Sequence, residues 1–222
     1  MVRFEGVIFD LDGTLIDTLE DLADALNRVL DRRGFPLHDY DEYKLLIGRG
    51  IRRLVTDALP DHRRDEATID ACYVEMLADY GEHCLLKTRP YDGVTELLER
   101  LVAADLPLAV YSNKADEFTQ RLVAALLPAG AFDLVVGARP GLPLKPDPAG
   151  ALSIADRLGI APGDIAYVGD SGTDMTTATR AGMVAVGVTW GFRSRDELLE
   201  HGAVALLDHP AQLLELASVA AT

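Results

Sequence analysis

Residues 7–18 read VIFDLDGTLIDT, an apolar run that changes abruptly into an acidic turn. Short apolar runs of this kind are typical of strands that are covered on both faces. Asp10 and Asp12 stand at the end of the run, and in an extended chain positions i and i+2 point to the same side. Gly13 then lets the backbone turn. The stretch therefore predicts two carboxylates that face one pocket at the tip of the first strand.

The close spacing of Asp10 and Asp12 restricts their chemistry. Two neighbouring carboxylates resist joint ionisation unless a cation neutralises them, and this predicts a bound Mg²⁺. With the cation in place, Asp10 can attack phosphorus, while Asp12 can protonate the departing alkoxide and later accept a proton from water. An isolated Asp-x-Asp pair is more often a cap on the turn that follows it. The interpretation therefore needs support from other parts of the chain.

The alternation of strands and helices after residue 90 predicts the fold class. Nearly all-apolar runs are separated by amphipathic stretches, which is the pattern of repeated βα units. We expect an α/β protein with a doubly wound, Rossmann-like core around a parallel sheet. Further strands are predicted at residues 108–111, 134–136, 165–168, 184–188 and 205–207, and helices include residues 94–102, 118–126, 151–158 and 175–181.

Residues 15–88 break this alternation, because apolar residues recur there at helical spacing. One helix is expected over residues 19–30, with a stop at Gly34, and further helices over 51–58 and 64–84. Asp39 and Glu42 have the spacing of a capping box before another helix. We therefore predict a small all-helical cap of residues 15–88, inserted after the first strand of a core domain that comprises residues 1–14 and 89–222.

Two further predicted strand ends carry groups that suit a phosphoryl substrate. Ser112 and Asn113 follow the strand at 108–111 and offer a hydroxyl and an amide, although such residues are more often turn or helix caps. Lys145 lies in the stretch LPLKPDP, where prolines fix the backbone and could hold a cation against developing negative charge. The ordinary alternative for a lysine is a solvated surface position.

The segment GDSGTD, residues 169–174, closes the strand at 165–168 and opens a helix. Asp170 is placed to bind the metal directly. Asp174, one turn later, could orient a metal-bound water or pair with Lys145, and Ser171 lies between the two acids. Helix capping is an equal alternative for Asp174. Because several separate strand ends all carry phosphate or metal chemistry, capping alone is a poor explanation of the set.

At this point the sequence resembles the haloacid dehalogenase superfamily, within it the phosphoglycolate phosphatase-like group with a helical cap. The motifs DLDGTLIDT, YSNK, LKPDP and GDSGTD occur in the family's order, and the segment GVTWGFRS at 187–194 is also similar. The resemblance implies Asp10 as nucleophile and Asp12 as general acid/base. It also implies metal ligation by Asp10, Asp170 and the Asp12 backbone carbonyl, with Ser112 and Lys145 holding the phosphoryl group.

The resemblance extends to substrate recognition. Residues 47–50, IGRG, are similar to a substrate-facing loop of the family, which implies that Arg49 contacts a carboxylate or other anionic group. Asn113 and Gly13 complete the implied substrate contacts. An ordinary surface arginine is the alternative for Arg49. Arg49, Lys114 and Lys145 are expected to gather as a basic site in an otherwise acidic protein.

The composition limits the partners of the protein. With 21 basic against 36 acidic residues the formal charge is −15, which disfavours nonspecific binding to nucleic acid or to an anionic membrane surface. No uninterrupted apolar stretch is long enough to cross a bilayer. We expect a cytoplasmic enzyme that acts on a small-molecule phosphate monoester, such as phosphoglycolate, and is a monomer or a homodimer.

Three alternatives remain open at this level: a phosphomutase, a noncatalytic regulator and a phosphonate hydrolase. A sugar-phosphate phosphomutase would need the same aspartyl chemistry and would differ only in the acceptor of the phosphoryl group. A noncatalytic phosphate-binding regulator could use an acceptor aspartate and a lysine, but it would not need Asp12 or a helical cap. A carbon-halogen dehalogenase is disfavoured by Asp12. A phosphonate hydrolase would need a lysine in the cap, for which Lys44 and Lys87 are the candidates.

Overall fold

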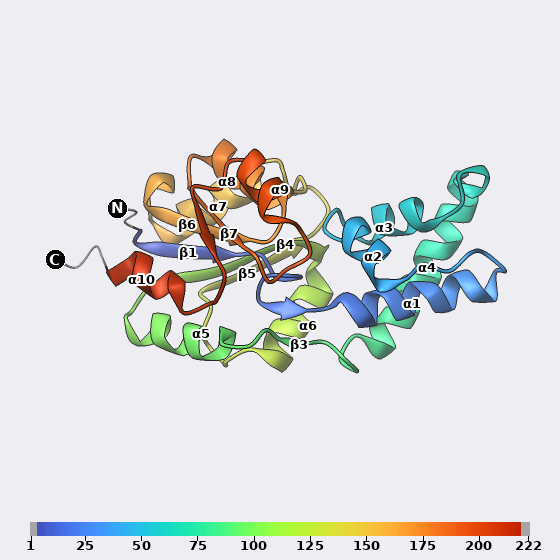
Figure 1. The fold of residues 1–222 in the computed structure, drawn as a ribbon, viewed down its shortest axis with the longest axis horizontal. Helices are drawn as coiled ribbons and strands as arrows, with labels where there is room; N and C mark the ends of the chain where they lie inside the picture. The colour runs from blue at the N-terminus through green and yellow to red at the C-terminus, as the bar shows by residue number, and fades with distance from the viewer. Residues whose placement is uncertain (1–3, 219–222) are drawn as a thin grey trace.

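The protein is built around a six-stranded, all-parallel sheet with the strand order β5-β4-β1-β6-β7-β8. The computed structural model describes residues 4–218. The doubly wound α/β fold predicted from the sequence is confirmed, with β1 at the centre of the sheet (Figure 1). The strands are β1 (Gly6–Phe9), β4 (Leu108–Ala115), β5 (Leu134–Ala138), β6 (Ile165–Gly169), β7 (Val184–Val188) and β8 (Ala205–Leu207).

The central strand is buried on both faces, as its apolar sequence requires. Val7 and Phe9 pack into one hydrophobic cluster, whereas Ile8 packs into the cluster on the opposite face. This division follows from the two-residue period of a strand. Figure 1 shows α5, α6 and α10 on one face and α7, α8 and α9 on the other. These helices are α5 (Val94–Ala103), α6 (Asp116–Leu126), α7 (Ala149–Leu158), α8 (Gly172–Ala181), α9 (Arg195–Glu200) and α10 (Gln212–Ser218).

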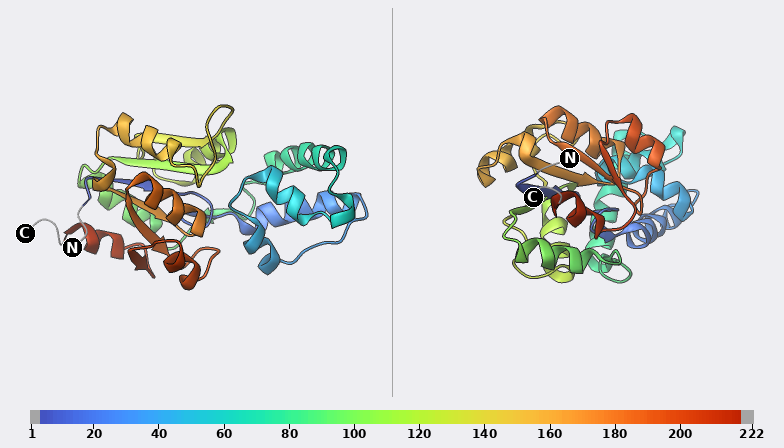
Figure 2. Two further views of the ribbon diagram at one scale, coloured as in Figure 1. Left: turned by 90° about the horizontal axis from the view of Figure 1, so that it is seen from above. Right: turned by 60° about the vertical axis from the view of Figure 1, so that its left-hand side comes forward.

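Four helices form a separate lobe beside the carboxyl ends of the strands (Figures 1 and 2). They are α1 (Leu19–Arg32), α2 (Tyr40–Leu46), α3 (Ile51–Ala58) and α4 (Glu66–His83). The lobe has an apolar interior, in which Leu26, Val55 and Met76 are fully buried, and this interior is continuous with the hydrophobic cluster that contains Phe9 on one face of the sheet. The expected capping box of Asp39 and Glu42 is present at the start of α2. The domain limits at residues 14/15 and 88/89 stay a prediction.

Two short strands join the helical lobe to the sheet domain, and the sequence did not indicate them. β2 (Ile16–Asp17) and β3 (Arg89–Pro90) pair antiparallel. Two 3₁₀ turns, Asp61–Arg63 and Pro162–Asp164, complete the regular elements. Within residues 4–218, none of the helices combines the length and the apolar character that a membrane span requires.

The predicted end of β4 was wrong by four residues. We expected Ser112 and Asn113 to follow a strand that stops at Tyr111, but β4 continues to Ala115. Its register with β5 is irregular between Tyr111 and Ala115. Ser112 and Asn113 are therefore buried strand residues, 3% and 5% exposed, rather than caps in a loop. The sequence did not predict this extension because strands were predicted from runs of apolar residues, and residues 112–114 of β4 are polar.

Candidate active site

The turn after β1 presents two aspartates in a fixed backbone arrangement. The Asp10 amide donates to the Val168 carbonyl at 2.9 Å and so continues the sheet pairing past Phe9. Gly13 has a φ of +82°, and a Cβ at this position would stand 2.3 Å from the Asp170 carboxylate. Only glycine therefore fits here, both for its dihedral angle and for the close approach of Asp170. The absence of a side chain at Gly13 leaves room for the Asp170 carboxylate.

Lys145 is the cation at the centre of the acid cluster. Its Nζ lies 2.8 Å from Oδ1 of Asp10 and 2.7 Å from Oδ1 of Asp174, and its side chain is 2% exposed. It also donates to the Tyr111 carbonyl at 3.2 Å. Burial opposes the charged form, but the charges of Asp10 and Asp174 raise the pKa of Lys145 well above its usual value. Lys145 is therefore a buried ammonium group, and its contact with Asp174 is one of the roles that the sequence left open for that acid.

Asn113 positions Lys145 through its backbone. The Asn113 Oδ1 accepts from the Lys145 amide at 2.8 Å, and its Nδ2 donates to the Lys145 carbonyl at 3.1 Å. The same Nδ2 lies 3.1 Å from the Gly48 carbonyl in the helical lobe. Asn113 therefore links the loop that carries Lys145 to the loop between α2 and α3.

Asp174 combines the two roles that the sequence left open. With Ser171 it forms a capping box at the start of α8, in which the Ser171 hydroxyl accepts from the Asp174 amide and Oδ2 of Asp174 accepts from the Ser171 amide. The Ser171 hydroxyl also donates to Oδ2 of Asp174 at 2.5 Å. Its other oxygen, Oδ1, accepts from Lys145. Asp174 is completely buried. Helix capping therefore fixes the carboxylate that in turn holds the lysine.

Three buried carboxylates converge closely enough to hold a metal ion. One oxygen each of Asp10, Asp170 and Asp174 lie within 4.8 Å of one another. Burial, with Asp174 adding to the effect and Lys145 opposing it, raises the pKa of Asp10 to about 7. Burial and the charges of Asp174 and Asp10 raise the pKa of Asp170 well above its usual value. The set fits a divalent cation, because one ammonium group leaves negative charge uncompensated among these acids.

Further contacts orient Asp170 toward this cluster. The Phe192 amide donates to Oδ2 of Asp170 at 2.7 Å, and the Thr14 hydroxyl lies 3.5 Å from Oδ1. Trp190 donates from its indole nitrogen to the Thr14 carbonyl at 3.0 Å. The segment after β7 therefore supports both the first turn and Asp170. The sequence indicated this segment only through its similarity to the family.

Asp12 stands apart from this cluster and pairs with a second buried lysine. Its two carboxylate oxygens lie 3.0 and 3.2 Å from Nζ of Lys114. The ammonium also lies 4.7 Å from the ring centre of Tyr80 on α4. Burial opposes the charged form of Lys114, but Asp12 and Tyr80 raise its pKa. The predicted metal ligands are Asp10, Asp12 and Asp170, whereas the three carboxylates that converge in the structure are those of Asp10, Asp170 and Asp174. Metal binding by the Asp12 backbone carbonyl stays a prediction.

The pairing of Lys114 with Asp12 was not predicted, although Lys114 was expected near the site. Ser112, Asn113 and Lys114 are consecutive on the part of β4 whose register is irregular, and all three line the same cavity. The Ser112 hydroxyl accepts from the Lys114 amide at 3.2 Å.

The two acids of the first turn face a cavity between the sheet domain and the helical lobe. Its volume is about 30 Å³. The sheet domain supplies polar walls and the helical lobe supplies mainly apolar ones. The lining residues are Asp10, Asp12, Ser112, Asn113 and Lys114 on one side and Leu22, Ile47, Gly48, Gly50, Ile51 and Leu54 on the other. A cavity of this volume holds about two water molecules.

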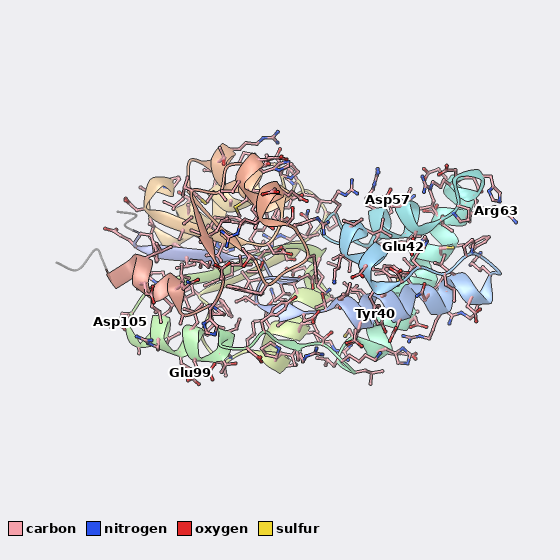
Figure 3. All side chains as sticks on the ribbon, in the orientation of Figure 1. Tyr40, Glu42, Asp57, Arg63, Glu99 and Asp105 are labelled. Atoms are coloured by element: carbon pink, nitrogen blue, oxygen red, sulfur yellow. The ribbon has the colours of Figure 1, made fainter. Side chains whose placement is uncertain are left out.

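Arg49 does not reach this cavity. Its side chain is half exposed and lies 3.2 Å from Oδ2 of Asp57, a residue labelled on the helical lobe in Figure 3. It instead lines an open groove of about 430 Å³ at the seam between the lobes. Arg52, Arg53 and Arg139 line the same groove, whose lining includes no acidic residue. The groove shares Gly50, Ile51 and Asn113 with the cavity, so the two spaces adjoin.

The structure is an α/β protein with buried acids at the tips of a parallel sheet beside a helical lobe, and comparison with known proteins identifies its family. The family model for haloacid dehalogenase-like hydrolases matches residues 7–188. The chain is 35% identical over 217 residues to a phosphoglycolate phosphatase of Chromobacterium violaceum, with 96% of each protein covered. It is 30% identical over 216 residues to an N-acetylmuramic acid 6-phosphate phosphatase of Pseudomonas aeruginosa, with 97% and 95% covered.

The same relationship holds in three dimensions. A crystal structure from Lactobacillus delbrueckii subsp. bulgaricus, of a proposed phosphoglycolate phosphatase, superposes with a TM-score of 0.90 at 31% identity. The match covers 96% of this chain and 98% of that one. The chain belongs to the haloacid dehalogenase-like hydrolases and is similar to the phosphoglycolate phosphatases among them. The resemblance seen in the four motifs is thereby confirmed.

Proposed function

We propose that the protein is a Mg²⁺-dependent phosphatase that hydrolyses small organic phosphate monoesters through an aspartyl-phosphate on Asp10. The observation that carries the proposal is the buried cluster of Asp10, Asp170 and Asp174 around Lys145, with Asp12 at the wall of the same cavity. Asp10, Asp170 and the Asp12 carbonyl would hold the ion. When bound, Mg²⁺ would neutralise the acids and stabilise charge on the phosphoryl oxygens.

In the first step an oxygen of Asp10 forms a bond to phosphorus, and the bond from phosphorus to the ester oxygen breaks. Asp12, which must hold a proton when the ester binds, gives this proton to the departing alkoxide. Lys114 holds the Asp12 carboxylate at the cavity wall and stabilises the ionised form that remains. Lys145 and Ser112 bind the phosphoryl oxygens during transfer. Asp12 then takes a proton from water, the water oxygen attacks phosphorus, and Asp10 is released with inorganic phosphate.

The helical lobe, residues 15–88, is proposed to act as a cap over this chemistry. It encloses the cavity and so excludes water while the ester reacts. The substrate class we favour is a small monoester with a second anionic group, as in phosphoglycolate. The adjoining arginine groove supports this choice, because Arg49 and Arg139 offer positive charge beside the cavity in a protein of charge −15. The names of the two sequence relatives are consistent with an anionic ester.

A panel of phosphate monoesters assayed with Mg²⁺ tests the proposal. We expect release of inorganic phosphate, loss of activity in excess chelator and recovery on adding Mg²⁺. Mass spectrometry of the acid-quenched protein should locate the phosphoryl group on Asp10. Full activity in chelator would contradict the metal role, and a phosphorylated residue elsewhere would contradict the assigned nucleophile.

The same assay separates hydrolysis from phosphoryl transfer to a sugar. A phosphomutase requires a bisphosphate activator and returns the phosphoryl group to substrate, whereas the proposed enzyme delivers it to water. Steady release of phosphate without any bisphosphate is therefore the expected result. Isomerised sugar phosphate without released phosphate would favour the mutase, and no turnover of any ester would favour a noncatalytic regulator.

A further inference from the structure

Arg193 of the sheet domain makes an unusual set of contacts with the helical lobe. Its guanidinium donates from Nη1 to the Lys44 carbonyl, and from Nη2 to the carbonyls of Leu45 and Ile47 at 3.2 and 2.7 Å. The side chain is 11% exposed. All three acceptors are backbone atoms at the end of α2 and in the loop that follows it. One side chain thus holds three carbonyls of the other lobe.

The chemistry of both partners suits this contact. The last carbonyls of a helix have no donor within the helix and must find one elsewhere. The guanidinium presents several N–H donors in a rigid plane, so it can satisfy neighbouring carbonyls together, and its hydrogen bonds carry a full charge. Glu197 lies 3.6 Å from Nε of Arg193 and restrains the side chain from behind. The contact therefore requires the lobes to be closed.

The carbonyls held by Arg193 lead directly into the loop that lines the cavity. Ile47, Gly48 and Gly50 form part of the cavity wall on the side of the helical lobe. Asn113 of the sheet domain donates to the Gly48 carbonyl. Arg193 and Asn113, both in the sheet domain, therefore bind successive carbonyls of this loop. On its other side, Arg193 follows Phe192, whose amide donates to Asp170. The segment joins the acid cluster to the cavity-lining loop.

We propose that Arg193 is a positioning residue, a latch that holds the cap closed and sets residues 47–50 against the cavity. The catalytic part of this proposal rests on the proposed phosphatase function, whereas the latch itself does not. Arg193 does not touch the reacting atoms. It acts through the backbone of the loop, so its loss lowers activity toward all monoesters alike, irrespective of their distal groups.

Arg193→Gln tests the latch, with Arg195→Gln as its matched control. Arg195 lies two residues away, is half exposed and pairs with Asp208 at 2.7 Å within the sheet domain. Cap position is measured without substrate, by energy transfer between dyes on cysteines placed at Arg63 and Glu99. These positions lie on the helical lobe and on α5 respectively (Figure 3). The two native cysteines are buried, which limits labelling to the introduced ones.

We expect Arg193→Gln to shift and broaden the dye distances, because the closed state loses three charge-assisted contacts, and Arg195→Gln to leave them unchanged. Where the wild type is active, kcat/KM should fall about tenfold for every monoester in Arg193→Gln. Arg193→Lys keeps the charge but not the planar fork, and we expect a loss of about threefold. It provides the same comparison if Arg193→Gln does not fold, as judged by near-ultraviolet circular dichroism.

The two readouts separate the latch from the proposed function. Wild-type dye distances in Arg193→Gln would overturn the latch. Shifted distances with an unchanged kcat/KM in an active enzyme would overturn its positioning role. If the wild type hydrolyses no monoester but the distances shift, the phosphatase proposal fails and the latch stands.

Discussion

The ion pairs of the acid cluster and the ion pairs on the surface of the helical lobe lie in opposite environments. Lys145 and Asp174 are 2% and 0% exposed, whereas Arg52 and Glu66 on the helical lobe are 46% and 83% exposed. A buried charge that loses its partner keeps its full desolvation cost, but an exposed one is simply hydrated. The proposed chemistry therefore depends on ion pairs that tolerate little substitution, whereas the ion pairs on the surface of the helical lobe tolerate more.

The nucleophile gives the largest expected effect. Asp10→Asn is nearly isosteric but replaces the carboxylate with a poor nucleophile, so turnover should fall by at least about a thousandfold. Phosphate release is the measurement, on protein shown by mass spectrometry to be free of deamidation. Wild-type rates would remove Asp10 from its assigned role.

The same variant should stabilise the metal-free protein at high pH. Burial raises the pKa of Asp10 from 3.8 to about 7. Because the pKa of Asp10 is higher in the folded state than in the unfolded state, ionisation of Asp10 costs stability. This cost begins as the pH rises above the unfolded-state pKa of 3.8 and is complete above the folded-state pKa of about 7. Asn removes this penalty but weakens the Lys145 contact. The net gain at pH 8 should be about 2 kcal/mol and should vanish near pH 4.

Removal of a buried and an exposed cation tests the comparison between the lobes directly. Lys145→Met leaves Asp10 and Asp174 without their shared ammonium, and the free energy of unfolding should fall by about 3–5 kcal/mol. Arg52→Met loses contacts to Glu66 and Asp70 at the surface, and the loss should stay below about 1 kcal/mol. Urea unfolding of both measures this. Equal losses would mean that burial does not distinguish the two sets of pairs.

Cation binding should depend on pH through Asp10. The protonated carboxyl group predominates below a pKa of about 7, and its proton must leave before the group can bind metal. Because Asp170 also has a raised pKa and must lose its proton to bind metal, the Mg²⁺ affinity of the wild type should fall at least tenfold per pH unit below about 7. Titration calorimetry between pH 5 and 8.5 measures this, with Ca²⁺ as a second ion. A flat profile would show that Asp10 is already ionised without metal.

Substitution of Arg49, in the groove at the seam between the lobes, should change activity least. Arg49→Ala is expected to raise KM about threefold to tenfold for carboxylate-bearing esters and to leave neutral esters and kcat nearly unchanged. Arg53→Ala is the matched control, since both arginines pair with Asp57 and line the groove. An equal rise in KM for charged and neutral esters would remove Arg49 from substrate recognition.

Sequence patterns predicted most of the fold because their signals are local. The apolar strand before Asp10 and the helical spacing of residues 19–30 depend only on the periods of strands and helices. The capping box at Asp39 depends on three-residue spacing. β4 was predicted too short because its last residues are polar, and burial beneath the cap, which permits this, is not visible locally.

The residue types of the site were likewise fixed by the sequence: acids after β1 and β6, and lysines at 114 and 145. Their pairing was decided only by the tertiary structure. Strand order and loop packing place Lys145 beside Asp10 and Asp174 and place Lys114 beside Asp12. They also place Arg49 in the groove and not in the cavity. Arg193 meets carbonyls almost 150 residues earlier in the chain. Such contacts depend on how distant segments pack, and periodicity along the chain carries no information about that.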